Sequence, residues 1–139
     1  MGPTKEPFEF RATLTDLDFG LATLHWSVEL LREAIGRDAE DRKLLLLETA
    51  LGEIGANVLT HGRPPGSERP VEYAIRVAEG IAVASFVDPG PPVHNHQTRA
   101  MPAPTSEDGR GLALARSLLD EFEYQRDGEV NRWRLVKRL

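Results

Sequence analysis

Hydrophobic and polar residues alternate in several short segments, a period of two that is typical of half-buried β-strands. A nearly continuous apolar segment near the middle, at 81–87, predicts a strand that is buried more fully than its neighbour. Tight turns are predicted at Glu79-Gly80 and at Asp127-Gly128, where the chain reverses between neighbouring strands. The five predicted strands span residues 8–14, 71–77, 81–87, 122–126 and 130–136.

Elsewhere, apolar residues recur every three or four positions, which predicts three helices. The first has its apolar stripe at 21–35 and ends at Gly36, the second begins near 38–41 and ends at Gly62, and the third runs from 111 to about 121. The order of these elements predicts an α+β fold. We expect a two-layer sandwich, with a mixed, mostly antiparallel sheet and helices on one face.

Composition narrows the class of protein. The 139 residues fit one domain, 1–139, with a short polar flexible N-terminus over 1–7. No apolar targeting segment or membrane span is visible, so we expect a cytoplasmic protein with no membrane partner. The absence of cysteine excludes disulfides, thiolate metal sites and a cysteine nucleophile. A net charge of -5 argues against direct binding of nucleic acid.

A polar stripe interrupts the second predicted helix. Glu53, Asn57 and His61 recur every four residues, so they lie on one line beside the apolar stripe. A carboxylate and an amide so close to the core would be costly if they were left unpaired. For Glu53 taken alone, a solvated helix face is the simpler interpretation.

Two glycine-containing segments could also form part of a ligand-binding site. Asp88 and Gly90 follow the buried strand at 81–87, which can direct a carboxylate into a pocket from a rigid base. Gly109 and Gly111 lie at the start of the third helix, where backbone N–H groups and the helix N-terminus favour an anion. Each segment alone is explained equally well as an ordinary turn or loop end.

Together, these features resemble the N-box, G1 box and G2 box of the GHKL (Bergerat-type) ATPase superfamily. The segments EIGANVLTHG (53–62) and GRGLALA (109–115) are similar to those of anti-sigma factor serine/threonine-protein kinases of the RsbW and SpoIIAB type. The resemblance covers almost the whole chain. It implies the Bergerat ATP-binding fold, with the irregular stretch at about 91–108 as an ATP lid.

The resemblance assigns a role to each box. Glu53 would be the general base, Asn57 would bind Mg²⁺ between the ATP phosphates, Asp88 would accept the adenine amino group, and Gly90 would keep the adenine slot open. Oxygen ligands suit Mg²⁺, and a carboxylate acceptor favours adenine over guanine. The G2 residues expected to bind the cofactor are Gly109, Arg110, Gly111 and Leu112.

The resemblance implies an anti-sigma factor that binds Mg-ATP, sequesters a sigma factor and phosphorylates a STAS-type anti-anti-sigma protein. Dimerisation is also expected. The alternative is an ATP-binding interaction module with weak or no kinase activity. It is favoured by Glu107-Asp108, where related proteins often have a basic residue, and by 130–132, where they tend to have Gly-Thr-Thr. A histidine kinase catalytic domain is less favoured, because no helical dimerisation segment precedes residue 8.

Two histidine features complete the candidates. His94 and His96 could bind a transition metal, but a solvated lid is the simpler interpretation because no third ligand is evident nearby. His25, next to Trp26 in the first helix, indicates a partner surface or a core surface and not a catalytic group.

Overall fold

The computed structural model describes residues 7–62, 69–93 and 107–139. Most of the predicted N-terminal segment and lid, including His94 and His96, therefore lies outside the described residues. The elements are β1 (Phe8–Leu14), α1 (Leu17–Ile35), α2 (Arg42–His61), β2 (Val71–Ala78), β3 (Ile81–Asp88), α3 (Glu107–Leu118), β4 (Glu121–Asp127) and β5 (Val130–Arg138).

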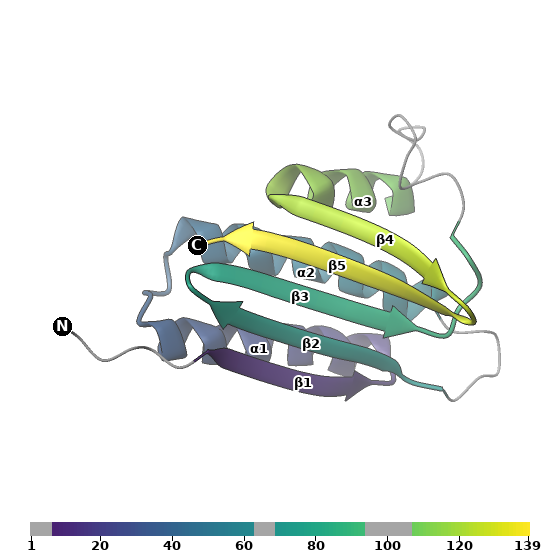
Figure 1. Cartoon of the computed structure of the whole chain (residues 1–139), viewed down its shortest axis with the longest axis horizontal. Coiled ribbons are helices and arrows are strands. Elements are labelled where there is room, and N and C mark those ends of the chain that lie inside the picture. The colour runs from purple at the N-terminus through teal and green to yellow at the C-terminus, as the bar shows by residue number, and fades with distance from the viewer. Residues whose placement is uncertain (1–6, 63–68, 94–106) are drawn as a thin grey trace.

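The five strands form one sheet in the order β1-β2-β3-β5-β4, and the helices cover one of its faces (Figure 1). This confirms the predicted α+β sandwich. The prediction of a mixed sheet was wrong, because every strand pair in the described residues is antiparallel. The reason lies in the connections: α1 and α2 form a helical hairpin between β1 and β2, so the chain returns with its direction reversed.

Local signals explain the ends of α1 and α2. The Asp16 carboxylate accepts a hydrogen bond from the Phe19 amide at 2.8 Å, and Asp41 does the same for Leu44 at 3.0 Å. Gly36 ends α1 in the left-handed conformation with a φ of 73°, as its position predicts. None of the described helices is both long enough and apolar enough to cross a membrane.

The third helix differs from its prediction. The sequence placed its start at 111, but α3 begins at Glu107, so Gly109 and Gly111 lie inside the helix. It also ends at Leu118, and β4 follows from Glu121. Glycine disfavours a helix interior, yet packing against α2 stabilises a helix that local propensity alone would not predict. The predicted lid therefore loses its last two residues to α3.

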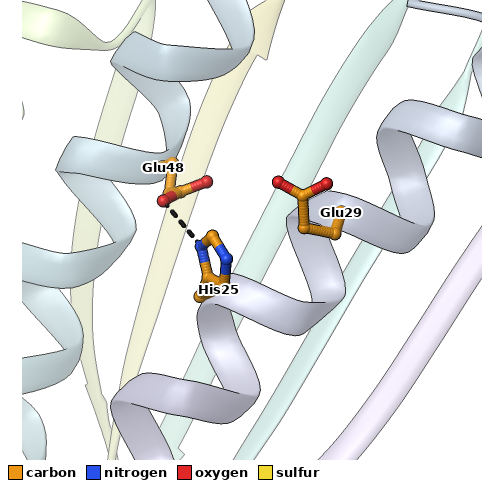
Figure 2. Close-up of side chains that lie close together, drawn as sticks. All are labelled: His25, Glu29 and Glu48. Carbon is orange, nitrogen blue, oxygen red and sulfur yellow. Dashed lines mark hydrogen bonds and ion pairs between the residues drawn. The ribbon is translucent and has the colours of Figure 1, made fainter. Parts of the chain in front are cut away.

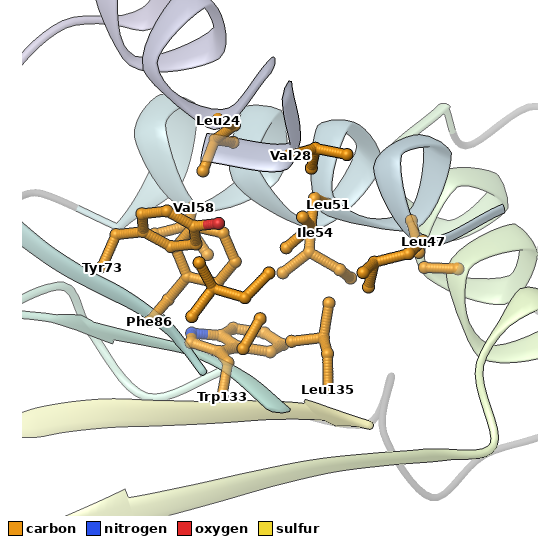
Figure 3. Close-up of a cluster of buried hydrophobic side chains, with 14 of the residues drawn as sticks. Leu24, Val28, Leu47, Leu51, Ile54, Val58, Tyr73, Phe86, Trp133 and Leu135 are labelled. Carbon is orange, nitrogen blue, oxygen red and sulfur yellow. The ribbon is translucent and has the colours of Figure 1, made fainter. Parts of the chain in front are cut away.

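The core lies between the sheet and the helices. Leu47, Leu51 and Ile54 of α2 point toward the sheet, where they meet side chains from β2, β3 and β5 (Figure 3). Trp133 is 1% exposed and stacks on Phe122, with ring centroids 6.1 Å apart. Alternate residues of the central strands fill this layer, as the period-two pattern predicts.

Helices α1 and α2 pack closely at two glycines. A Cβ atom added at Gly20 would overlap with the Leu59 side chain, and one added at Gly55 would overlap with Leu24. Each helix thus has a glycine at the point where a leucine side chain of the other helix packs against its backbone. Gly52, also in α2, has open space around it.

This difference predicts opposite effects of two alanine substitutions in one helix. Gly52→Ala should raise the free energy of unfolding by roughly 0.5–1 kcal/mol, because alanine has the higher helix propensity. Gly55→Ala gains the same propensity but overpacks the core, which typically costs about 1–3 kcal/mol. Urea denaturation of both variants should therefore show Gly52→Ala as the more stable one. Equal midpoints would contradict the close packing at Gly55.

Candidate functional site

Glu53, the first residue of the polar stripe of α2, lies against α3. Glu53 and Asn57 are half-buried, His61 is exposed, and the first two make no hydrogen bond to any described residue. A Cβ atom added at Gly111 would lie only 2.7 Å from the Glu53 Oε2 atom, so the glycine allows this carboxylate to approach the α3 backbone. Unpaired polar groups at a half-buried position are available to a ligand.

The second part of the site surrounds the Asp88 carboxylate at the end of β3. Asp88 is 1% exposed. Its Oδ1 accepts hydrogen bonds from the Asn131 side-chain amide at 2.8 Å and from the Gly90 backbone amide at 2.9 Å. Its Oδ2 accepts one from the Trp133 indole N–H at 2.7 Å. A buried carboxylate is therefore held by three donors.

Burial and hydrogen bonding have opposite effects on the pKa of the Asp88 carboxyl. Burial raises the pKa of this carboxyl above its ordinary value, because a charge is disfavoured away from water. The hydrogen bonds from Asn131, Trp133 and Gly90, followed by the Arg126 charge, lower the pKa and partly offset that effect. A carboxylate balanced in this way suits binding of a donor group, such as an exocyclic amine.

Two glycines bring the end of α2 against this carboxylate. A Cβ atom added at Gly62 would lie 2.9 Å from the Asp88 Cγ atom, and one added at Gly90 would lie 2.7 Å from the Gly62 backbone. Gly90 is thus required by a close backbone approach, in addition to any contact with a ligand.

Helix α2 therefore runs between two chemically different regions. Glu53 lies near α3, whose N-terminus favours negative charge, while Gly62 lies beside Asp88. The two α2 residues are separated by about 14 Å along the helix axis at 1.5 Å per residue.

A family model described as "Histidine kinase-like ATPase domain" matches residues 14–137. The chain belongs to this family. The predicted resemblance to GHKL ATPases is thus confirmed, and membership implies that this histidine kinase-like ATPase domain binds ATP. None of the curated proteins compared with the chain matches it significantly.

Solved structures agree on the fold of the domain. It is similar to the RsbU and RsbW domains of Rv1364c from Mycobacterium tuberculosis, with a TM-score of 0.68 and 21% identity, over 95% of this chain and 32% of that one. It is also similar to the Acinetobacter baumannii histidine kinase AdeS (TM-score 0.53, 11% identity, 93% and 67% covered). The catalytic domain of histidine kinase ThkA gives a TM-score of 0.53 at 16% identity, with 96% and 95% covered.

The remaining predicted residues of the ATPase domain belong to α3. Gly109 and Arg110 lie in its first turns, and the side chain of Arg110 is outside the described residues. Leu112 is 7% exposed and packs into the core, so it holds α3 in place from behind the site. The structure thus brings the N-box and the G2 box together at Glu53 and Gly111.

Sequence reasoning missed the residues that hold Asp88. Asn131 lies directly opposite Asp88 in the β3–β5 pairing, and Trp133 reaches it from the same face of β5. The available signal was the alternation along β5, which places Asn131 on the core face with Trp133 and Leu135. A polar residue at a core position indicates a buried partner.

A separate charged cluster lies at the surface between α1 and α2 (Figure 2). His25 and Glu29 of α1 and Glu48 of α2 bring ligand atoms within 4.8 Å of one another. However, the His25 Nδ1 and Glu48 Oε2 atoms are hydrogen-bonded at 2.9 Å, and Glu29 pairs with Arg32. Each of the three side chains therefore has a hydrogen-bond or ion-pair partner within the protein. The prediction that His25 belongs to a surface agrees with its exposure.

The His25–Glu48 pair predicts a pH dependence. The hydrogen bond to Glu48 and its charge raise the pKa of His25, so this pair stabilises the fold below the ordinary histidine pKa and ceases to do so as pH rises through the raised value. Glu48→Gln should lower the pKa of His25 in an NMR titration and reduce stability only on the acid side. Glu33→Gln, on the exposed side of α1, is the control and should leave the His25 pKa unchanged.

Proposed function

We propose that this chain is an anti-sigma factor and protein serine/threonine kinase, which binds Mg-ATP, sequesters a sigma factor and phosphorylates a STAS-type protein. The similarity to a structure containing an RsbW domain supports this proposal. The observation that carries it is the approach of Glu53 to Gly111, which joins a carboxylate base to the predicted phosphate end of the site.

The described residues fit the proposed ligands. Asp88 is a buried acceptor that suits an adenine amino group, and Asn57 offers a half-buried amide with no other hydrogen bond to the described residues. Mg²⁺, held by the Asn57 amide oxygen and the phosphates, would supply neutralisation of phosphate charge. An N-terminal helix end and glycine-rich backbone near Glu53 suit the phosphates themselves.

In the proposed reaction, the hydroxyl oxygen of the partner's serine or threonine forms a bond to the γ-phosphorus of ATP. The bond from that phosphorus to the β–γ bridging oxygen breaks, and ADP leaves. Glu53 accepts the hydroxyl proton. Its carboxylate lies beside α3, at the predicted phosphate end of the site, where it could receive that proton.

The second candidate is an ATP-binding interaction module with weak or no kinase activity. Glu107 and Asp108 support it, because two acidic residues precede the G2 glycines inside the first turn of α3. Acidic side chains at that position would repel the phosphates of ATP. This candidate keeps the same nucleotide site and the same protein partners, without transfer.

One experiment separates the two candidates. The chain is incubated with Mg-ATP and a STAS-domain protein encoded in the same genome, and the intact mass of the partner is measured. A gain of one phosphate supports the kinase. An unchanged mass, together with a stable nucleotide-dependent complex in size-exclusion chromatography, supports the binding module. If neither a phosphate nor a complex with a STAS protein or sigma factor is found, the proposed function is wrong.

A further inference from the structure

Asn131 of β5 is the centre of a buried hydrogen-bond network. Its side chain is 1% exposed, and its Nδ2 donates to Asp88 Oδ1 at 2.8 Å and to the Pro91 carbonyl oxygen at 2.9 Å. Its Oδ1 accepts from the Tyr124 hydroxyl and, at 3.1 Å, from the Arg126 guanidinium. The amide is therefore fixed on both sides and cannot rotate away from Asp88 without breaking several bonds.

Trp133 adds an equally constrained donor. Its ring packs between Phe122 and Tyr124, with centroid distances of 6.1 and 4.7 Å. This packing aims the indole N–H at Asp88 Oδ2, 2.7 Å away. Two side chains from one strand thus hold one oxygen each of the same carboxylate.

Counting acceptor positions shows what remains for a ligand. A carboxylate offers about four lone-pair positions, two on each oxygen. Oδ1 of Asp88 receives two donors, from Asn131 and the Gly90 amide, while Oδ2 receives one, from Trp133. Among the described residues, no other group bonds to this carboxylate, so one lone-pair position on Oδ2 has no donor.

We propose that Asn131 and Trp133 are positioning residues for the nucleotide base: they keep the buried Asp88 carboxylate ionised and oriented, so that its last acceptor position receives the 6-amino group of adenine. This inference rests on the proposed nucleotide site. It assigns to β5 a part in base selectivity, since an ionised carboxylate accepts a hydrogen bond from adenine but repels the 6-oxo group of guanine.

Among the described residues, one charged group acts on the Asp88 carboxyl. Arg126 of β4 is the charged group that acts on it, and it also donates to the Gly90 carbonyl oxygen at 2.7 Å. From α2, the nearest neighbour is the uncharged Gly62. The donors Asn131 and Trp133 are therefore the main groups that oppose protonation of the buried carboxyl, and their removal should favour its neutral form.

The test removes each donor separately. Asn131→Ala deletes the amide, and Trp133→Phe deletes the indole N–H while keeping an aromatic ring. Arg132→Gln is the matched control, because Arg132 lies between them on β5 but points to the opposite, exposed face, where it pairs with Asp127. The use of two independent variants keeps the test decisive if one of them does not fold.

Two quantities are measured for each variant. The first is the pKa of Asp88 in the nucleotide-free protein, from the ¹³C shift of its carboxyl, with Asp88→Asn to assign the signal. The second is the affinity for ATP and for GTP, by calorimetry from about pH 5 to about pH 8, always relative to wild type so that titration of the nucleotides cancels.

We expect both donor variants to raise the pKa of Asp88 and the control to leave it unchanged. The loss of ATP affinity on acidification should then begin at higher pH. The preference for ATP over GTP should fall by roughly tenfold in acid, since a neutral carboxyl can donate to the 6-oxo group. An unchanged pKa in both variants would overturn the positioning role. A raised pKa with an unaltered ATP/GTP preference would instead overturn the assignment of adenine to Asp88.

Discussion

Replacing Glu53 by glutamine is expected to slow phosphoryl transfer to the STAS partner by about 100-fold or more. Glutamine keeps the shape and hydrogen-bonding capacity of the side chain beside Gly111, but it cannot take the proton of the acceptor hydroxyl at neutral pH. Because the base acts in the transition state, binding of Mg-ATP should stay within a few-fold of wild type. Single-turnover transfer, read by intact mass, measures the first effect, and calorimetry measures the second.

Glu48→Gln is the matched control for this experiment. Glu48 lies on the same helix, but it pairs with His25 on the surface, so its substitution should leave transfer unchanged. Transfer at the wild-type rate in Glu53→Gln would mean that the base lies elsewhere. Loss of ATP binding in that variant would assign Glu53 to the metal or phosphate site, in place of proton transfer.

Asp88→Ala should weaken ATP binding by about 1–3 kcal/mol, since it removes a charged acceptor for the adenine amino group. The same substitution removes the acceptor of the buried Trp133 indole N–H and one of the acceptors of the Asn131 amide, which should lower the free energy of unfolding by roughly 1–3 kcal/mol. Calorimetric titration with ATP well below the melting temperature separates the two effects.

Asp127→Ala provides the comparison for Asp88→Ala. Asp127 is an exposed residue at the end of β4, and its pairing with Arg132 at the surface should contribute little to stability. Its removal should leave ATP affinity unchanged. If Asp88→Ala binds ATP as tightly as Asp127→Ala does, Asp88 is a structural residue and the base of the nucleotide binds elsewhere.

Most of the fold follows from local signals. The bounds of β1 agree with the alternation, the start of β3 agrees with the apolar segment at 81–87, and α1 ends at the predicted Gly36. The start of α3 was missed because its glycines suggest a break, whereas the contact with α2 decides the outcome. The all-antiparallel pairing was also missed, because strand neighbours depend on how the helical hairpin returns the chain.

The candidate site was only partly predictable. Glu53, Asn57 and Asp88 could be singled out by spacing and by resemblance. The roles of Asn131 and Trp133 could not, because they depend on the register between β3 and β5, which pairs Asp88 with Asn131. Register is a property of the folded sheet, and residues more than 40 positions apart carry no local signal of it.

The short hairpin between β4 and β5 fixes the register of β5 against β4. Asp127 pairs with Val130, which leaves only two residues in the turn. Adding or removing one residue and shifting β5 by one position would turn Asn131 and Trp133 toward solvent and bring Arg132 into the core. Related sequences that keep this nucleotide site should therefore conserve the length of the turn and a residue that tolerates the left-handed φ of 63° at Gly128, so that an insertion there marks a domain that has lost its base selectivity.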